Sequence, residues 1–157
     1  MSENPLPSLE QTREWLENSV LEVLGTMAHV VAFPNPSASP RSSVPTLFTS
    51  SVGFKGDANL TVCFYTPEHS AALLASKFLD MPESELDGAM IHDVLGEFAN
   101  MAVGAVKSRF SDSGVRCVMT IPTVKDAASM PSNKNSESEQ VLFEIGQDWV
   151  LADIKLA

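Results

Sequence analysis

Apolar residues recur at helical spacing in three segments of the chain. The first segment spans residues 8–31, and the second spans residues 66–79, where Thr66 offers a cap and Pro67 opens the first turn. The third and longest runs over residues 91–110 and has an apolar side wide enough to face a core. The pattern therefore predicts three amphipathic helices.

Shorter apolar runs between these helices have the length and composition of β-strands. Residues 47–55 and 59–65 flank the turn sequence "GDAN", which predicts a hairpin, and residues 115–121 read as a single strand. Residues 141–146 and 149–157 predict a second hairpin. Because strands that come in hairpins pair antiparallel, we expect an α+β fold of two layers, with long helices packed on a mostly antiparallel sheet.

Two segments show neither the helical spacing of apolar residues nor the apolar runs of strands. Residues 33–46 contain four prolines and several serines, and residues 125–140 are polar and low in complexity, so both are predicted to be loops. A chain of 157 residues suits one domain with a core of its own, and we treat residues 1–157 as a single domain.

A weak internal repeat links the first and third predicted helices. The sequence "SVLEVLGTMA" (19–28) aligns without gaps to "DVLGEFANMA" (93–102). Either the chain contains a duplication, or two amphipathic helices resemble each other by chance. Where the second copy has Asp93, Glu97 and Asn100, the first has Ser19, Val23 and Thr26, so only the second presents this polar triplet.

Composition narrows the classes of function. The net charge of −10 disfavours nucleic acid as a partner, because it repels phosphate backbones. No apolar run is long enough to cross a membrane, and the first residues lack the features of a signal peptide, so we expect a cytoplasmic protein. Cys63 and Cys117 have no paired spacing and suggest reduced thiols, with one disulfide between neighbouring strands as the alternative. The histidines His29, His69 and His92 show no ligand spacing, and no metal site is expected.

One side of the third helix carries a polar stripe. Asp93, Glu97, Asn100 and Gly104 fall within an arc of roughly 60°, and Lys107 continues the same line. A glycine inside a helix costs about 1 kcal/mol relative to alanine, and core packing does not easily explain one on an exposed stripe. Gly104 would let another molecule approach the backbone closely. A merely solvated helix face is the alternative interpretation.

The spacing D-x3-E-x2-N, followed by N-x3-G, resembles the signature of the CheC/CheX/FliY phosphatases, which act on phosphorylated CheY-type response regulators in bacterial chemotaxis. Pro122, with 21 residues between it and Asn100, matches the proline of that signature. The single motif and the wording "EFANMAVGAVKS" are most similar to CheX-like members. The resemblance extends from about residue 9 to the end but is specific only over residues 91–122. It implies long helices on an antiparallel sheet, and a homodimer.

The resemblance also implies an enzyme, a phosphatase for the phospho-aspartate of a receiver in two-component signalling. Asn100 would hold the attacking water, because its amide both donates and accepts hydrogen bonds and carries no charge. Glu97 would pair with the lysine of the receiver site, Asp93 would assist docking at the rim, and Gly104 would leave room for the partner. Lys107, which continues the stripe, is also expected to contact the partner. The protein would need no cofactor of its own, because the receiver would bring the Mg²⁺ ion.

Two other classes of function remain open at this stage. The chain would be a binding module if it docks on a receiver or a flagellar-switch component without catalysis. It would be a structural dimer if the polar helix is only solvated. The presence of both Glu97 and Asn100 favours the enzyme, since a pure adaptor would not need the asparagine.

Overall fold

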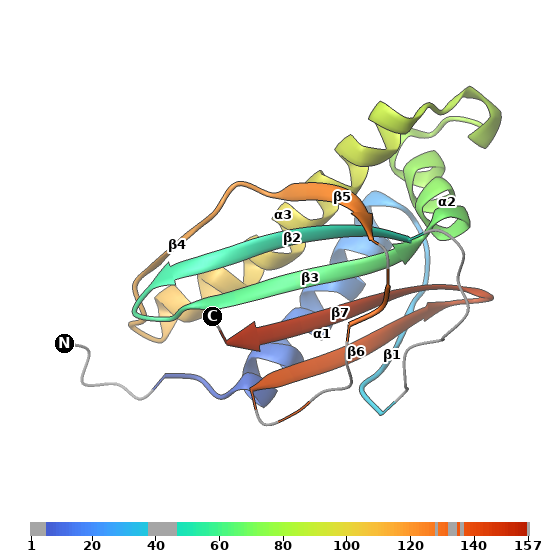
Figure 1. Ribbon diagram of the computed structural model, residues 1–157. Coiled ribbons are helices and arrows are strands. Elements are labelled where there is room, and N and C mark those ends of the chain that lie inside the picture. Colours follow the sequence, from blue (N-terminus) through green and yellow to red (C-terminus); the bar gives the residue numbers. More distant parts are fainter. Residues whose placement is uncertain (1–5, 38–46, 128, 132–134, 136, 157) are drawn as a thin grey trace.

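The computed structural model describes residues 6–37, 47–127, 129–131, 135 and 137–156, and it shows an α+β fold (Figure 1). The helices are α1 (Leu9–Met27), α2 (Glu68–Leu79) and α3 (Gly88–Asp112), with a short 3₁₀-helix η1 (Glu83–Glu85). The strands are β1 (Phe33–Asn35), β2 (Leu47–Gly56), β3 (Leu60–Pro67), β4 (Cys117–Met119), β5 (Thr123–Ala127), β6 (Ser138–Ile145) and β7 (Asp148–Leu156). The predicted fold class is therefore confirmed.

All strand pairs in the described residues are antiparallel and form one seven-stranded sheet. The strand order is β1-β6-β7-β3-β2-β4, and β5 also pairs with β2. Helices α1 and α3 lie side by side across one face of this sheet, and α2 lies at one end of it (Figure 1).

The helix boundaries follow local capping chemistry. Ser8 caps α1, with its hydroxyl accepting a hydrogen bond from the Gln11 amide at 3.0 Å. The helix ends at Met27, not at residue 31 as predicted, because His29 takes the left-handed conformation with φ 55°. The carboxylate of Asp87 caps α3 by accepting from the Met90 amide at 2.9 Å.

The predicted start of α2 is wrong. Strand β3 continues through Thr66, which pairs with Phe48 of β2, and ends only at Pro67. Pro67 then occupies the cap position of α2, and no side chain caps this helix. Thr66 is therefore a buried residue of the sheet and not a helix cap.

Both predicted hairpins are confirmed, as β2–β3 and β6–β7. The first depends on Gly56, whose φ is 138° and where a Cβ atom would lie 2.6 Å from the Arg116 carbonyl oxygen. The predicted strand 115–121 is shorter than expected, since β4 covers only Cys117–Met119. Both Cys63 and Cys117 are free thiols, so the alternative of a disulfide is wrong.

The two predicted loops are partly strands. Residues 33–35 form β1, which pairs with β6 at the edge of the sheet, where a proline such as Pro34 does not interrupt a ladder on both sides. Strand β5 pairs with β2 and overlaps the predicted loop 125–140, and β6 begins inside that segment. These strands were missed because they are short or largely exposed and so lack an apolar alternation. Residues 38–46 lie outside the described part of the chain.

The succession of elements supports the internal repeat. A helix followed by an edge strand and a hairpin occurs twice, as α1-β1-β2-β3 and as α3 with β4–β5, β6 and β7. The edge strand of each half pairs with the hairpin of the other half. In α1, however, the aligned positions Ser19 and Val23 are buried, and the Ser19 hydroxyl donates to the Ala102 carbonyl at 2.6 Å. Thr26, the counterpart of Asn100, is exposed in α1, but only α3 exposes all three aligned positions as polar side chains.

Aromatic side chains fix α3 on the sheet. Phe98 and Phe110 of α3 are almost fully buried. The ring of Phe98 packs against Phe64 of β3 with centroids 5.0 Å apart, and Phe110 meets Phe54 of β2 at 5.3 Å. Burial of such a side chain contributes about 1.5–3 kcal/mol, so the buried side of α3 holds its exposed side in a defined orientation.

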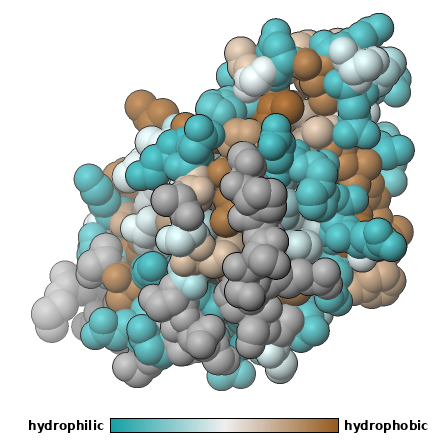
Figure 2. Space-filling view, turned by 45° about the vertical axis from the view of Figure 1, so that its right-hand side comes forward, coloured by the Kyte–Doolittle hydropathy of each residue, from teal (hydrophilic) through white to brown (hydrophobic). Residues whose placement is uncertain are grey.

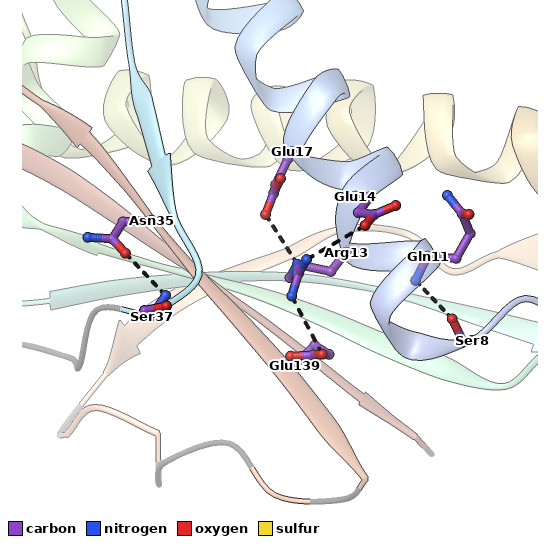
Figure 3. A network of polar contacts seen from close by, with 8 residues as sticks. All are labelled: Ser8, Gln11, Arg13, Glu14, Glu17, Asn35, Ser37 and Glu139. Atoms are coloured by element: carbon purple, nitrogen blue, oxygen red, sulfur yellow. Dashed lines mark hydrogen bonds and ion pairs between the residues drawn. The ribbon is translucent and has the colours of Figure 1, made fainter.

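An ion-pair network ties α1 to β6 (Figure 3). The guanidinium of Arg13 lies 3.2 Å from the Glu17 carboxylate on the next helical turn and 3.7 Å from Glu139 of β6. Glu14 lies at the limit of an ion pair, at 4.0 Å. Arg13 therefore joins the helix layer to β6, which lies next to the β1 edge of the sheet.

The outer surface is mixed in character. Figure 2 shows hydrophilic side chains interspersed with hydrophobic ones over the described part of the visible face. None of the helices in the described ranges has both the length and the apolar composition that a membrane crossing requires.

Candidate functional site

The polar residues of α3 stand on its exposed side. Asp93, Glu97 and Asn100 are all exposed to solvent. The opposite side of the same helix faces the core and buries Val94, Leu95, Phe98, Ala99, Ala102, Val103, Val106 and Phe110. Because a helix turns by about 100° per residue, the rigid packing of these apolar residues determines where the polar side chains point.

An open depression runs between α3 and the edge of the sheet. It is lined by His92, Asp93, Gly96, Glu97 and Asn100 of α3, by Pro122 just before β5, and by Val124 of β5. The structure thus brings Pro122 to the wall opposite Asn100, although the two are far apart in the sequence. Four of the predicted site residues share this depression, namely Asp93, Glu97, Asn100 and Pro122.

Two further predicted residues lie outside the depression. A Cβ atom at Gly104 would meet no other group within 4 Å, so internal packing does not require the glycine. Lys107 lies near β4. Burial raises the pKa of the Cys117 thiol there, and the positive charge of Lys107 opposes that rise. Gly104 and Lys107 therefore extend the stripe beyond the depression, toward the end of α3.

Sequence reasoning missed three residues of the depression: His92, Gly96 and Val124. The sequence did contain a signal for His92 and Gly96. Both precede Asn100 at intervals of four residues, and this spacing places the three residues in one row along a helix. In the sequence His92 shows only the absence of metal-ligand spacing, but in the structure its side chain lies against the sheet. Its ring packs edge-on against Phe48 of β2, with centroids 5.3 Å apart and planes at 78°.

The polar side chains of the depression are two carboxylates, one amide and the imidazole of His92. Glu97 forms no ion pair with any cation of the described residues, so its carboxylate is available to a partner. Asn100 can donate and accept hydrogen bonds at the same time. In the described ranges, no three histidine, cysteine, aspartate or glutamate side chains come close enough to form a metal site.

Comparison with protein families gives one match. The family described as chemotaxis phosphatase CheX matches residues 48–146, which is more than half of the chain and includes all of α3 and its polar stripe. A comparison with curated protein sequences found no match.

Several solved structures share the fold over nearly the whole chain. The chemotaxis protein CheX of Vibrio vulnificus matches with a TM-score of 0.77 and 19% identity, covering 93% of this chain and 99% of that chain. A CheX–CheY–BeF3–Mg²⁺ complex from Borrelia burgdorferi matches with a TM-score of 0.75 and 20% identity, covering 92% and 97%. FliY of Thermotoga maritima matches with a TM-score of 0.68 and 12% identity, covering 95% and 89%. At these identities the likeness shows the fold.

Proposed function

Because the chain belongs to the chemotaxis phosphatase CheX family, we propose that it removes the phosphoryl group from the phospho-aspartate of a CheY-type response-regulator receiver. One observation carries the proposal: Glu97 and Asn100 stand exposed on one side of α3 and face Pro122 across an open depression. The similar CheX of B. burgdorferi forms a complex with CheY, which supports a receiver as the partner of this chain as well.

Asn100 is the group that we assign to the attacking water. A phospho-aspartate is an acyl phosphate, and its hydrolysis needs a water in line with the bond that breaks. The neutral amide of Asn100 can accept a hydrogen bond from this water and donate one to a phosphoryl oxygen, without repelling the phosphate charge. We expect the receiver to contribute a lysine and a Mg²⁺ ion that balance the phosphoryl charge. Positioning of the water supplies several kcal/mol of barrier reduction.

Glu97 is the group that we assign to docking. Its carboxylate is exposed and lacks a cationic partner among the described residues, so pairing with a receiver lysine would break no internal contact. Asp93 lies one helical turn earlier and adds negative charge at the rim. Gly104 and Lys107 continue the contact surface, with Gly104 leaving the helix backbone open to a partner.

The test is phosphate release from a panel of receivers of the host, each phosphorylated with a small-molecule donor. We expect this protein to accelerate release from at least one receiver. Acceleration from none of them would show that the proposed activity is wrong. Binding to a receiver without any acceleration would instead identify the protein as a non-catalytic adaptor.

A further inference from the structure

Along α3, the depression has His92 at one end, Asn100 at the other and Gly96 as its floor between them. His92, Gly96 and Asn100 form one row along α3, each four residues from the next, and this row faces Pro122 and Val124. The row spans about 12 Å along the helix axis, at 1.5 Å per residue. The missing side chain of Gly96 lowers the middle of the row between two larger side chains.

Packing alone does not explain Gly96. A Cβ atom built there would lie 3.5 Å from Cγ2 of Val124, which is an ordinary van der Waals contact, so alanine would fit between α3 and β5. The glycine also costs helix stability. What alanine would change is the depth of the floor between the helix and the wall formed by Pro122 and Val124.

His92 is a fixed boundary of the depression. Its ring rests edge-on against the half-buried Phe48, which limits the orientations that the imidazole can adopt. Among the described residues the imidazole nitrogens have no hydrogen-bond partner, so they are available to a docked molecule. At the opposite end of the row stands Asn100, which we assign to the water.

On the basis of the proposed function, we propose that His92 is a positioning residue that sets the register of the receiver along α3. In this arrangement the lysine-bearing segment of the receiver enters the depression over Gly96. The apolar stem of the lysine packs on Val124 and Pro122 while its ammonium group reaches Glu97. The ring of His92 stops the segment at one end, so that the phosphoryl group comes to Asn100 at the other.

Four variants test this register: His92→Ala, His92→Gln, Gly96→Ala and, as a matched control, Gly25→Ala. Gly25 is an exposed helix glycine in α1 where a Cβ atom, unlike one at Gly96, would meet nothing within 4 Å. Both alanine-for-glycine changes should raise the melting temperature, because alanine is the better helix former. Kinetics would use the receiver that wild-type protein dephosphorylates fastest, and binding would use its beryllofluoride-activated form.

The expected results separate the effect of Gly96 on the depth of the depression from the effect of His92 on the position of the receiver along α3. Gly96→Ala should raise KM and weaken binding by about tenfold, as an extra methyl group in a filled contact does, while Gly25→Ala leaves both unchanged. His92→Ala should lower kcat by about tenfold with little change in KM, because a shift of about 1 Å misplaces the reacting atoms. His92→Gln should regain much of kcat, since it retains length and a polar end.

Two outcomes would overturn the register proposal while leaving the phosphatase activity intact. They are wild-type kcat in His92→Ala, and identical KM values for Gly96→Ala and Gly25→Ala. A wild-type protein that releases phosphate from no receiver of the panel would overturn the proposed function, and this inference with it.

Discussion

At the scale of single residues, Glu97 and Asn100 lie one turn apart on α3 but differ in what they offer. A carboxylate attracts a cation from a distance and holds it, whereas a neutral amide orients a water molecule through directed hydrogen bonds. Both side chains are exposed and make no contact on which the core depends. Substitutions at these positions therefore report on function with little effect on folding.

Replacing Asn100 should abolish most of the turnover without unfolding the protein. Asn100→Ala opens no cavity and improves helix propensity by up to about 0.7 kcal/mol, so its melting temperature should equal or exceed that of the wild type. Asn100→Asp is nearly isosteric but cannot donate and brings negative charge to the phosphoryl group, so it should also be defective. Phosphate release and receiver binding are measured together. Full activity of Asn100→Ala on a confirmed substrate would disprove the water-positioning role.

Replacing Glu97 should weaken docking more than it slows chemistry. Glu97→Ala removes one side of a charge pair and should cost about 2 kcal/mol of binding free energy, and Glu97→Lys should cost more because it repels the receiver lysine. Binding to the beryllofluoride-activated receiver measures this difference. Glu22→Lys, at an exposed position of α1, is the control for the change in net charge. Equal activity of wild type and Glu97→Lys would contradict the assigned role.

At the scale of elements, the contact between α1 and β6 contains the carboxyl group of Glu17, whose charged form is disfavoured in the folded protein. Burial raises the pKa of Glu17 above its ordinary value of 4.5, and this effect exceeds the opposing attraction of Arg13. The folded protein then binds more protons than the unfolded chain between the two pKa values. Stability consequently falls as the pH rises through that window, and the loss is complete above the folded pKa.

Glu17→Gln should therefore melt at a higher temperature than wild type at pH 7, because the neutral amide avoids the desolvation of a charge. The difference should shrink as the pH falls through the raised folded pKa of Glu17 and should be lost by the ordinary value of 4.5, below which Glu17 is protonated in both the folded and the unfolded chain. Thermal melts at several pH values measure it, with Glu22→Gln on the exposed side of the same helix as the control. A lower melting temperature at pH 7 would mean that the Arg13 ion pair outweighs the cost of burial.

At the scale of the whole molecule, the sheet has two edges that no other strand of the described residues pairs with. Strand β1 ends one side and strands β4 and β5 end the other. Large apolar side chains are exposed at both edges, namely Val31 and Phe33 near β1, and Val118 and Ile121 near β4. Unpaired edges with exposed apolar side chains are sites where a second chain can add.

We predict that the protein is a homodimer. Light scattering should give a particle of twice the chain mass of 16.9 kDa at working concentration. Phe33→Lys and Ile121→Lys place a charge at opposite edges, and the variant that yields monomers identifies the edge in the interface. A monomeric wild type at the same concentration would show that the prediction is wrong.

Local patterns in the sequence determined the helices, the two hairpins and the face of α3 that carries Asp93, Glu97 and Asn100. Helical periodicity and turn chemistry act over a few residues, so they can be recognised without the rest of the chain. The same local rules failed at Thr66, which has the composition of a helix cap, because pairing with Phe48 of β2 extends the strand past it.

Only the tertiary structure decided the parts that depend on contacts between distant segments. β5 is recognisable as a strand through its pairing with β2, and that pairing brings Pro122 and Val124 opposite α3. The inward orientation of Ser19 in α1 and the contact of His92 with Phe48 likewise depend on how helices pack on the sheet. Long-range packing selects these arrangements from many that the local sequence permits, and the depression between α3 and β5 exists only as their result.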